Sequence, residues 1–217
     1  DHYRALCPDD PAQTRMRLAA HDDAALTPDY VRALFDGYAE NFDRDLEGKL
    51  RYRVPELLRA AVTRVWNGAN PTCAILDLGC GTGLCGKVFA PHIRHLSGVD
   101  LSPKMLARAA ATGLYHELAA DDIVRWMNLT ERRFDLVLAA DVLVYLGDLR
   151  PLFEAVRRVL IPGGLFAGTV EQLPATEGQD FLLQPKRRYA HAESYLMRLT
   201  ESHGFLPITL EPCIPRH

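Results

Sequence analysis

The chain has 217 residues, of which 48% are hydrophobic and 24% are charged, and this composition excludes a disordered or collagen-like protein. Its 25 Lys and Arg residues are outnumbered by 28 Asp and Glu residues, and the net charge of −3 gives no large positive field for holding nucleic acid non-specifically. The length and composition favour a single α/β domain with a small appendage.

The first 50 residues are predicted to form a helical preface. Apolar side chains recur at spacings of three and four from Tyr30 to Phe42, and Thr27 followed by Pro28 is typical of a helix start. Residues 51–217 are predicted to form the larger unit, in which helices and strands alternate.

The elements of this larger unit follow the order of a parallel sheet that is covered on both faces. The predicted strands are 73–78, 96–100, 117–120, 134–139, 165–170 and 206–211, and the predicted helices include 55–66, 103–112 and 149–160. Pro162-Gly163-Gly164 is expected to end the last of these helices and to lead into the next strand. The predicted fold class is therefore α/β, with a doubly wound and mostly parallel sheet.

The stretch from Ile75 to Gly86 is the most informative, because a strand runs directly into a glycine-rich turn and then into a helix. Glycines allow a tight bend and let a ligand approach the backbone closely. Gly81-x-Gly83-x-x-Gly86 fits the dinucleotide fingerprint, and Asp100, 21 residues after Gly79, ends the next strand where a carboxylate can accept both hydroxyls of a ribose. These residues predict a nucleoside-bearing cofactor.

The same stretch resembles the first motif of class I methyltransferases, which use S-adenosylmethionine. The resemblance covers about residues 70–170, and its motifs are Asp77 to Gly83, Gly98 to Leu106, Asp122-Ile123, Phe134 to Asp141, and Leu160 to Leu165. It implies a Rossmann-like methyltransferase fold and in-line transfer of a methyl group.

The resemblance also implies roles for individual residues. Gly79, Cys80 and Gly81 would contact the methionine part of the cofactor, Asp77 would orient the turn and the amino group, and Asp100 would bind the ribose. The adenine would be bound by Leu101, Met105, Asp122 and Ile123, with the backbone of Ala140 beneath the cofactor and with Tyr38 and Tyr52 covering it.

Several of these residues also have a structural interpretation. Leu101 and Met105 fit the core, Asp122 fits a turn cap with Asp121 as its rival for the adenine, and the tyrosines fit aromatic packing. Two other functions remain open: a non-catalytic module that binds S-adenosylmethionine, and an NAD(P)-dependent oxidoreductase. Asp77 disfavours the oxidoreductase, because a carboxylate beside the turn faces a cation better than a pyrophosphate.

The two ends of the chain resemble bacterial methyltransferases that follow tetratricopeptide repeats. Segments 30–43 and 50–58 carry this resemblance, and residues 1–20 look like the remnant of one repeat, which implies an upstream repeat region. The family usually completes its sheet with an antiparallel hairpin, so the seventh strand is expected to be missing or to lie beyond the given sequence.

The acceptor is predicted to be a small molecule or a protein, methylated at oxygen, with nitrogen as the alternative. Asp141 is a candidate catalytic residue, but the Pro-Pro-aromatic sequence of enzymes that methylate amino groups in nucleic acids does not follow it, so no nucleic acid partner is expected. Residues after Val170 are placed to form an acceptor wall: Glu171, Lys186, Arg187, Arg188, Tyr189 and His191. Its basic cluster would bind an anionic substrate or simply be solvated, and His191 is a candidate general base or otherwise a histidine at a helix start or on the surface.

The five cysteines form no Cys-x-x-Cys pair, which favours a reduced cytoplasmic setting without a metal site. Apolar runs are too short to cross a membrane, so a soluble protein with no membrane partner is expected.

Overall fold

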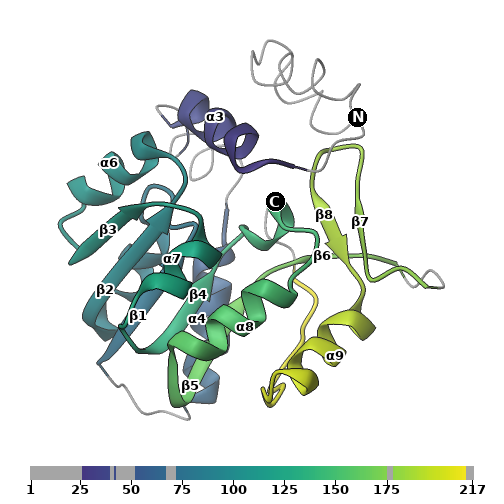
Figure 1. The fold of residues 1–217 in the computed structure, drawn as a ribbon. Helices are drawn as coiled ribbons and strands as arrows, with labels where there is room; N and C mark the ends of the chain where they lie inside the picture. Colours follow the sequence, from purple (N-terminus) through teal and green to yellow (C-terminus); the bar gives the residue numbers. More distant parts are fainter. Residues whose placement is uncertain (1–25, 40–41, 43–51, 67–71, 175–177, 214–217) are drawn as a thin grey trace.

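The computed structural model describes residues 26–39, 42, 52–66, 72–174 and 178–213. A five-stranded parallel sheet lies at its centre, in the order β3-β2-β1-β4-β5 (Figure 1). The strands are β1 (Cys73–Leu78), β2 (Ile93–Asp100), β3 (Glu117–Ala120), β4 (Phe134–Ala139) and β5 (Leu160–Gly168). The strand order reverses at β1, which confirms the predicted doubly wound fold and places a crevice beyond the carboxyl ends of β1 and β4.

Helices cover both faces of the sheet, and the alternation of side chains along the strands explains why. Ile75, Leu136 and Leu138 pack with Val62 and Phe89 from α4 (Val54–Val65) and α5 (Leu84–Phe89). The alternate residues of β1 and β4 pack with α7 (Ile123–Leu129) and α8 (Arg150–Val159) on the opposite face. All six residues of β1 are buried, as expected of a central parallel strand.

The predicted helix start at Thr27 is confirmed. Helix α3 (Pro28–Tyr38) begins after Thr27, whose Oγ1 accepts a hydrogen bond from the N–H of Tyr30 at 3.2 Å. Helix α3 packs against α6 (Pro103–Ala111), near the carboxyl ends of the strands (Figure 1). The suggested repeat remnant at 1–20 and the boundary between residues 50 and 51 lie outside the described residues.

Strand β5 differs from its prediction. It begins at Leu160, five residues before the expected start, and Pro162-Gly163-Gly164 lies inside it rather than ending a helix. Leu160 pairs with Phe134 and Leu165 pairs with Leu136, so the intervening residues form an irregularity opposite one residue of β4. Proline is tolerated here because β5 is an edge strand of this sheet.

Several other elements were not expected from the sequence. Two short 3₁₀ helices, η2 (Ala90–His92) and η3 (Leu143–Tyr145), precede β2 and follow β4. The C-terminal part forms a three-stranded sheet of β6 (Glu171–Gln172), β8 (Tyr189–His191) and β7 (Phe181–Leu183), followed by α9 (Glu193–Ser202). The predicted strand 206–211 is wrong: Leu206 and Ile208 are 88% and 61% exposed, and the segment pairs with no described strand. No helix among the described residues has the length and apolar character needed to span a bilayer.

Candidate functional site

The turn that follows β1 is built from glycines with positive φ. The φ angles are +62° at Gly79, +54° at Gly81 and +92° at Gly83, which other residues rarely adopt. The N–H groups of Gly79 and Cys80 both donate to the carbonyl oxygen of Val99, at 2.8 and 3.2 Å. A Cβ added at Gly81 would have its nearest neighbours at 4.0 Å. The turn is therefore fixed to β2, while its face at Gly81 is open.

Asp100, at the end of β2, faces this turn. Its Oδ2 accepts the N–H of Gly81 at 2.9 Å and its Oδ1 accepts the N–H of Ser102 at 2.8 Å. Burial raises the pKa of Asp100, and the two backbone hydrogen bonds act in the opposite direction. Each carboxylate oxygen keeps a further lone pair, so the group is held in a fixed orientation and can still accept two ligand hydroxyls.

Asp77, at the other side of the turn, is 1% exposed. Burial raises its pKa to about 7, while the hydroxyl of Tyr115, which donates to Oδ2 at 2.6 Å, acts to lower it. Tyr115 is not among the residues predicted from the sequence. Tyr115 lies just before β3 and belongs to no sequence motif that would mark it as a site residue. Its contact with Asp77 is formed only in the folded chain.

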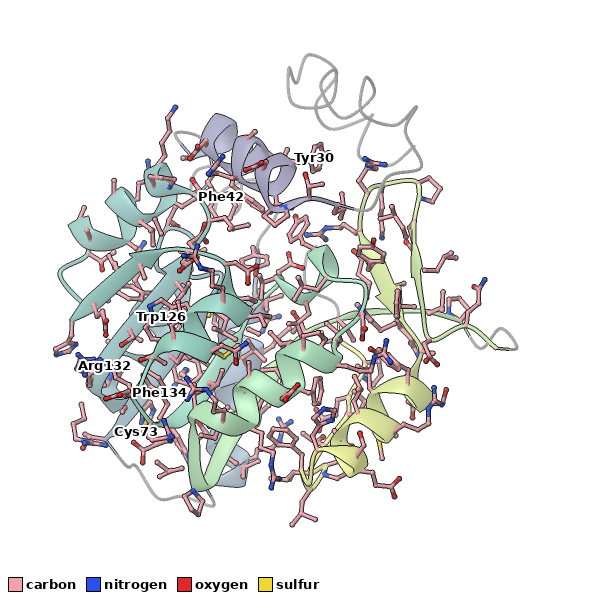
Figure 2. All side chains as sticks on the ribbon, in the orientation of Figure 1. Tyr30, Phe42, Cys73, Trp126, Arg132 and Phe134 are labelled. Carbon is pink, nitrogen blue, oxygen red and sulfur yellow. The ribbon has the colours of Figure 1, made fainter. Side chains whose placement is uncertain are left out.

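Aromatic residues gather over the open side of the turn. A ring atom of Phe42, which is labelled in Figure 2, would lie 4.0 Å from a Cβ at Gly81. Phe42 packs edge-on against Phe35 and Tyr38, and Phe35 packs edge-on against Tyr145 at a centroid distance of 5.4 Å. We call Phe35, Tyr38, Phe42 and Tyr145 the aromatic cluster. The predicted covering residue Tyr38 thus lies beside the turn.

A hydrogen bond also joins α3 to the site. Ser102 Oγ donates to Asp36 Oδ1 at 2.6 Å, and Ser102 is the residue whose N–H binds Asp100. The other predicted covering residue, Tyr52, is partly buried two residues before α4, and its role stays a prediction.

The residues assigned to the adenine lie at the same edge of the sheet, with two differences from expectation. Met105 has no exposed surface, which fits the core interpretation. Asp122 Oδ1 accepts the N–H of Arg125 at 2.9 Å and so caps α7, while Asp121 Oδ1 binds Arg125 at 3.3 Å. The remaining assigned residues are Leu101, which is partly exposed, Ile123, which opens α7, and Ala140, which follows β4. Their adenine and backbone roles stay predictions.

The basic cluster of the predicted acceptor wall is paired with carboxylates. Arg188 lies between Asp141 Oδ2 at 3.2 Å and Glu171 Oε1 at 3.1 Å, and its guanidinium lies over the ring of Tyr145. Lys186 pairs with Glu171 at 2.7 Å. The structure thus brings this segment to the end of β4, as predicted, but the protein's own carboxylates offset much of its positive charge.

The same segment reaches helix α3. The Arg187 guanidinium lies 5.6 Å from the ring centroid of Tyr30, which belongs to the first turn of α3 and is labelled in Figure 2. Asp141 adopts a positive φ of 58°, and its N–H donates to Thr169 Oγ1 at 2.9 Å. The candidate catalytic carboxylate of Asp141 is therefore held by its backbone and by Arg188.

His191 lies in the core. It has no exposed surface, its Nε2 is 3.0 Å from the carbonyl oxygens of both Leu146 and Gly147, and its ring stacks on Tyr195. Because carbonyl oxygens only accept, Nε2 carries the proton and serves as a structural donor. Burial lowers the pKa of His191. The expectation of a surface histidine is therefore wrong, and the buried position disfavours the general base: His191 is a structural donor at the end of β8.

We expect His191→Ala to lower thermal stability far more than turnover. The change removes two buried hydrogen bonds and leaves a cavity, whereas loss of a general base would reduce kcat by roughly 10²–10⁴. Since the folded pKa is lowered, the contribution of His191 to stability is present above pH 6.5 and is lost as the pH falls through that value. Thermal melts at pH 5 to 8 and saturating kinetics measure both effects. A large loss of kcat without a change in melting temperature would restore the base role.

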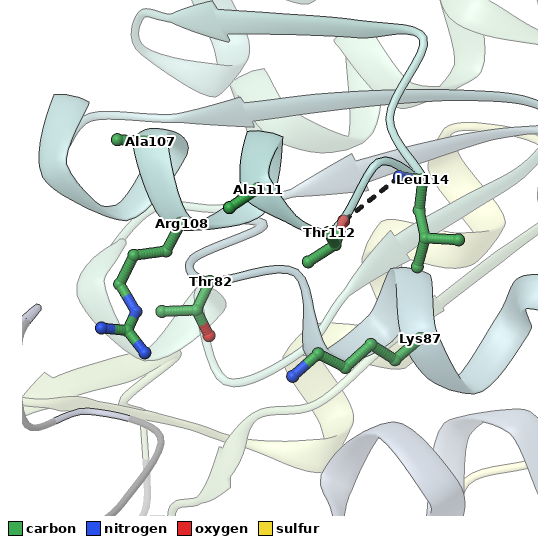
Figure 3. A pocket seen from close by; sticks show the side chains of 7 residues that line it. All are labelled: Thr82, Lys87, Ala107, Arg108, Ala111, Thr112 and Leu114. Carbon is green, nitrogen blue, oxygen red and sulfur yellow. Dashed lines mark hydrogen bonds between the residues drawn. The ribbon is translucent and has the colours of Figure 1, made fainter.

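A hollow of about 620 Å³ lies between α5 and α6 (Figure 3). It is lined by Thr82, Lys87, Ala107, Arg108, Ala111, Thr112 and Leu114. Neither Asp77 nor Asp100 lines it, and only Thr82 belongs to the glycine turn. The hollow is therefore distinct from the cofactor site.

The doubly wound sheet, the glycine turn after β1 and the partly buried carboxylate that ends β2 together match the Rossmann-like fold of class I methyltransferases. Residues 75–164 match the family model of a methyltransferase domain. Methyltransferase-like protein 27 of Homo sapiens is 40% identical over 95 residues, or 42% of this chain and 38% of that protein. Malonyl-[acyl-carrier protein] O-methyltransferase of Pseudescherichia vulneris is 29% identical over 140 residues, which are 64% of this chain and 52% of that protein.

Among solved structures, N-methyltransferase NodS of Bradyrhizobium japonicum WM9, in complex with S-adenosyl-L-homocysteine, is similar to this chain. The TM-score is 0.54 and the identity 26%, covering 75% of this chain and 84% of that one. The chain spans at most about half the length of the two curated relatives above. Residues 75–164 thus match a methyltransferase domain, and the chain has the fold of class I S-adenosylmethionine-dependent methyltransferases.

Proposed function

We propose that the chain transfers the methyl group of S-adenosylmethionine to an oxygen atom of a small molecule or protein. The observation that carries this proposal is the open face at Gly81, fixed beside the Asp100 carboxylate and the buried Asp77. This arrangement offers a glycine backbone that can be approached closely, a diol acceptor and a negative charge to one ligand with a ribose and a cationic end.

The chain's own residues would hold that ligand as the resemblance implies. Gly79, Cys80 and Gly81 would lie along its methionine part, Asp77 beneath its amino group, and Asp100 on its ribose. Leu101, Asp122 and Ile123 would contact the adenine from the starts of α6 and α7.

When bound, S-adenosylmethionine supplies a methyl group on a positively charged sulfur. The protein's task is then to align the acceptor with that methyl group, and alignment alone can lower a barrier by several kcal/mol. The aromatic cluster would exclude water from this space. Asp141, held by Arg188, would accept the proton of a hydroxyl acceptor.

The relatives support transfer without fixing the acceptor atom, because one is named an O-methyltransferase and another an N-methyltransferase. The net charge of −3 supports acceptors other than nucleic acid. We further propose that the protein is cytoplasmic. We also propose that it is related to the bacterial methyltransferases that follow tetratricopeptide repeats.

The product S-adenosylhomocysteine is expected to raise the melting temperature, and NAD is not. At 100 times its dissociation constant, a ligand stabilises the fold by about 2.7 kcal/mol, which corresponds to roughly 5–10 °C for a chain of this size. Thermal-shift titrations with both compounds make the measurement. Stabilisation by NAD alone would favour an oxidoreductase.

The acceptor class is tested with labelled S-adenosylmethionine and fractions of metabolites and cell protein. Label incorporation that is lost in Asp100→Ala would support the enzyme and identify the acceptor class. Tight binding of the cofactor without transfer to any fraction would instead support the non-catalytic module.

A further inference from the structure

The ring of Tyr115 fills a space that three glycines leave free. A Cβ added at Gly98 would lie 2.7 Å from Tyr115 Cε1, and one added at Gly83 or Gly86 would lie 3.0 Å from Cε2. These glycines come from the turn after β1, from α5 and from β2, so the ring is wedged among all three. Gly83 and Gly86, which fit the dinucleotide fingerprint in the sequence, thus accommodate Tyr115.

The wedge directs the Tyr115 hydroxyl to Asp77. The oxygen donates to Asp77 Oδ2 at 2.6 Å, within the length of a strong hydrogen bond to a carboxylate. Asp77 is buried and lies two residues before Gly79, so a small rotation of its side chain would move the carboxylate relative to the turn. Tyr115 therefore sets the orientation of this carboxylate.

The groups around Asp77 are acids. Asp100 raises the pKa of Asp77, and the thiols of Cys80 and Cys85, both buried, are themselves raised in pKa by burial and by Asp77. No ion pair joins Asp77 or Asp100 to a Lys or Arg among the residues that the structure describes. The raised pKa values keep both thiols protonated, so the negative charge of the site comes from Asp77 and Asp100, and a cationic ligand would favour the ionised form of Asp77.

We propose that Tyr115 is a positioning residue of the donor site, whose hydroxyl holds the Asp77 carboxylate in the orientation that receives the cationic methionine end of S-adenosylmethionine. This inference rests on the proposed donor-binding role of the glycine turn. It extends that role to a side chain from the segment between α6 and β3, 38 residues away in sequence.

The proposal predicts how donor affinity depends on pH. Asp77 is protonated below about pH 7 in the free protein, and a cationic ligand binds the ionised form better. Affinity therefore rises as the pH increases through about 7, and binding releases a proton. Without the Tyr115 hydroxyl, which favours ionisation, the rise shifts to higher pH.

The test is calorimetric titration of S-adenosylhomocysteine and S-adenosylmethionine into the whole chain between pH 5.5 and 8.5. Tyr115→Phe keeps the ring in the glycine space and removes only the hydroxyl. We expect Tyr115→Phe to bind both compounds about tenfold more weakly than the wild type at pH 7, which is the order of effect of one hydrogen bond to a charged group. The difference in affinity between the two proteins should decrease as the pH rises.

Tyr195→Phe is the matched control. The Tyr195 hydroxyl also donates to a carboxylate, Asp148 Oδ1 at 3.0 Å, but Tyr195 is buried on α9. Both variants should lose some thermal stability, and only Tyr115→Phe should change donor affinity and its pH profile.

The Asp77→Asn variant tests whether Asp77 is the group whose ionisation controls donor affinity. It also replaces Tyr115→Phe as the test if that variant does not fold. Its donor affinity should be low and should no longer rise through pH 7. If wild-type protein binds neither compound at any pH, the donor-site function itself fails. If wild-type protein binds, the positioning role is overturned by identical curves for Tyr115→Phe, or by an unchanged pH profile in Asp77→Asn.

Discussion

Asp100→Ala is expected to weaken binding of S-adenosylhomocysteine at least tenfold and, if both ribose hydroxyls bind the carboxylate, on the order of 100-fold. Each charge-assisted hydrogen bond contributes roughly 1.5–3 kcal/mol, and two would be lost together. The change also frees the N–H groups of Gly81 and Ser102, which Asp100 now accepts at 2.9 and 2.8 Å. Loosening of the glycine turn should add to the loss. Calorimetry on the folded variant measures the effect.

Asp135→Ala is a suitable control for this experiment. Asp135 also accepts a backbone N–H, that of Ala74 at 2.7 Å, and it also binds Arg94, but it lies at the amino end of the sheet. The Asp135→Ala variant should have a lower free energy of unfolding than the wild type and an unchanged affinity for S-adenosylhomocysteine. Near-wild-type affinity in a folded Asp100→Ala protein would remove Asp100 from the site.

The central sheet could be predicted because its strands carry their own signals. The runs at 73–78, 117–120 and 134–139 match β1, β3 and β4 at both ends. In each case a short, mostly apolar run is bounded by polar or turn residues. Burial on both faces demands this pattern in β1 and β4, whereas β3 is an edge strand that is only partly buried. The glycine turn and Asp100 follow directly, since parallel strands bring their carboxyl ends to one edge.

Elements that depend on distant partners were harder to predict. Segment 206–211 alternates apolar and polar residues like a strand, but no described strand pairs with it. Conversely, Tyr189–His191 is too short to signal a strand and forms one through pairing with both β6 and β7. Strand formation in these regions is decided by tertiary partners rather than by local pattern.

The candidate site divides in the same way. Gly79, Gly81 and Asp100 are recognisable from spacing, whereas Tyr115 is identified by the three glycines that make room for it. His191 resembled a base because it follows a basic run, but the fold buries it against two carbonyl oxygens. Burial and hydrogen-bond partners, which decide such roles, are properties of the folded chain.

Gly79→Ala is expected to lower both stability and donor binding. The position has a φ of +62°, where an L-residue costs roughly 1–2 kcal/mol, and the new Cβ would lie 2.5 Å from Val142 Cγ2. Relieving that overlap costs about 1–3 kcal/mol more and must move either the turn or the loop after β4. For a chain of this size, the melting temperature should fall by roughly 5–15 °C.

Gly113→Ala separates backbone strain from the displacement of the turn. Gly113 has a φ of +70°, and a Cβ there would meet nothing within 4 Å. It should lose only about 1–2 kcal/mol of stability and keep wild-type donor affinity. In Gly79→Ala, displacement of the turn on the order of 1 Å should reduce turnover about 100-fold in protein that is still folded. Equal losses of stability in the two variants, with unchanged turnover in both, would contradict this prediction. The turn would then tolerate a side chain at position 79, and the open face at Gly81 would not depend on a glycine there.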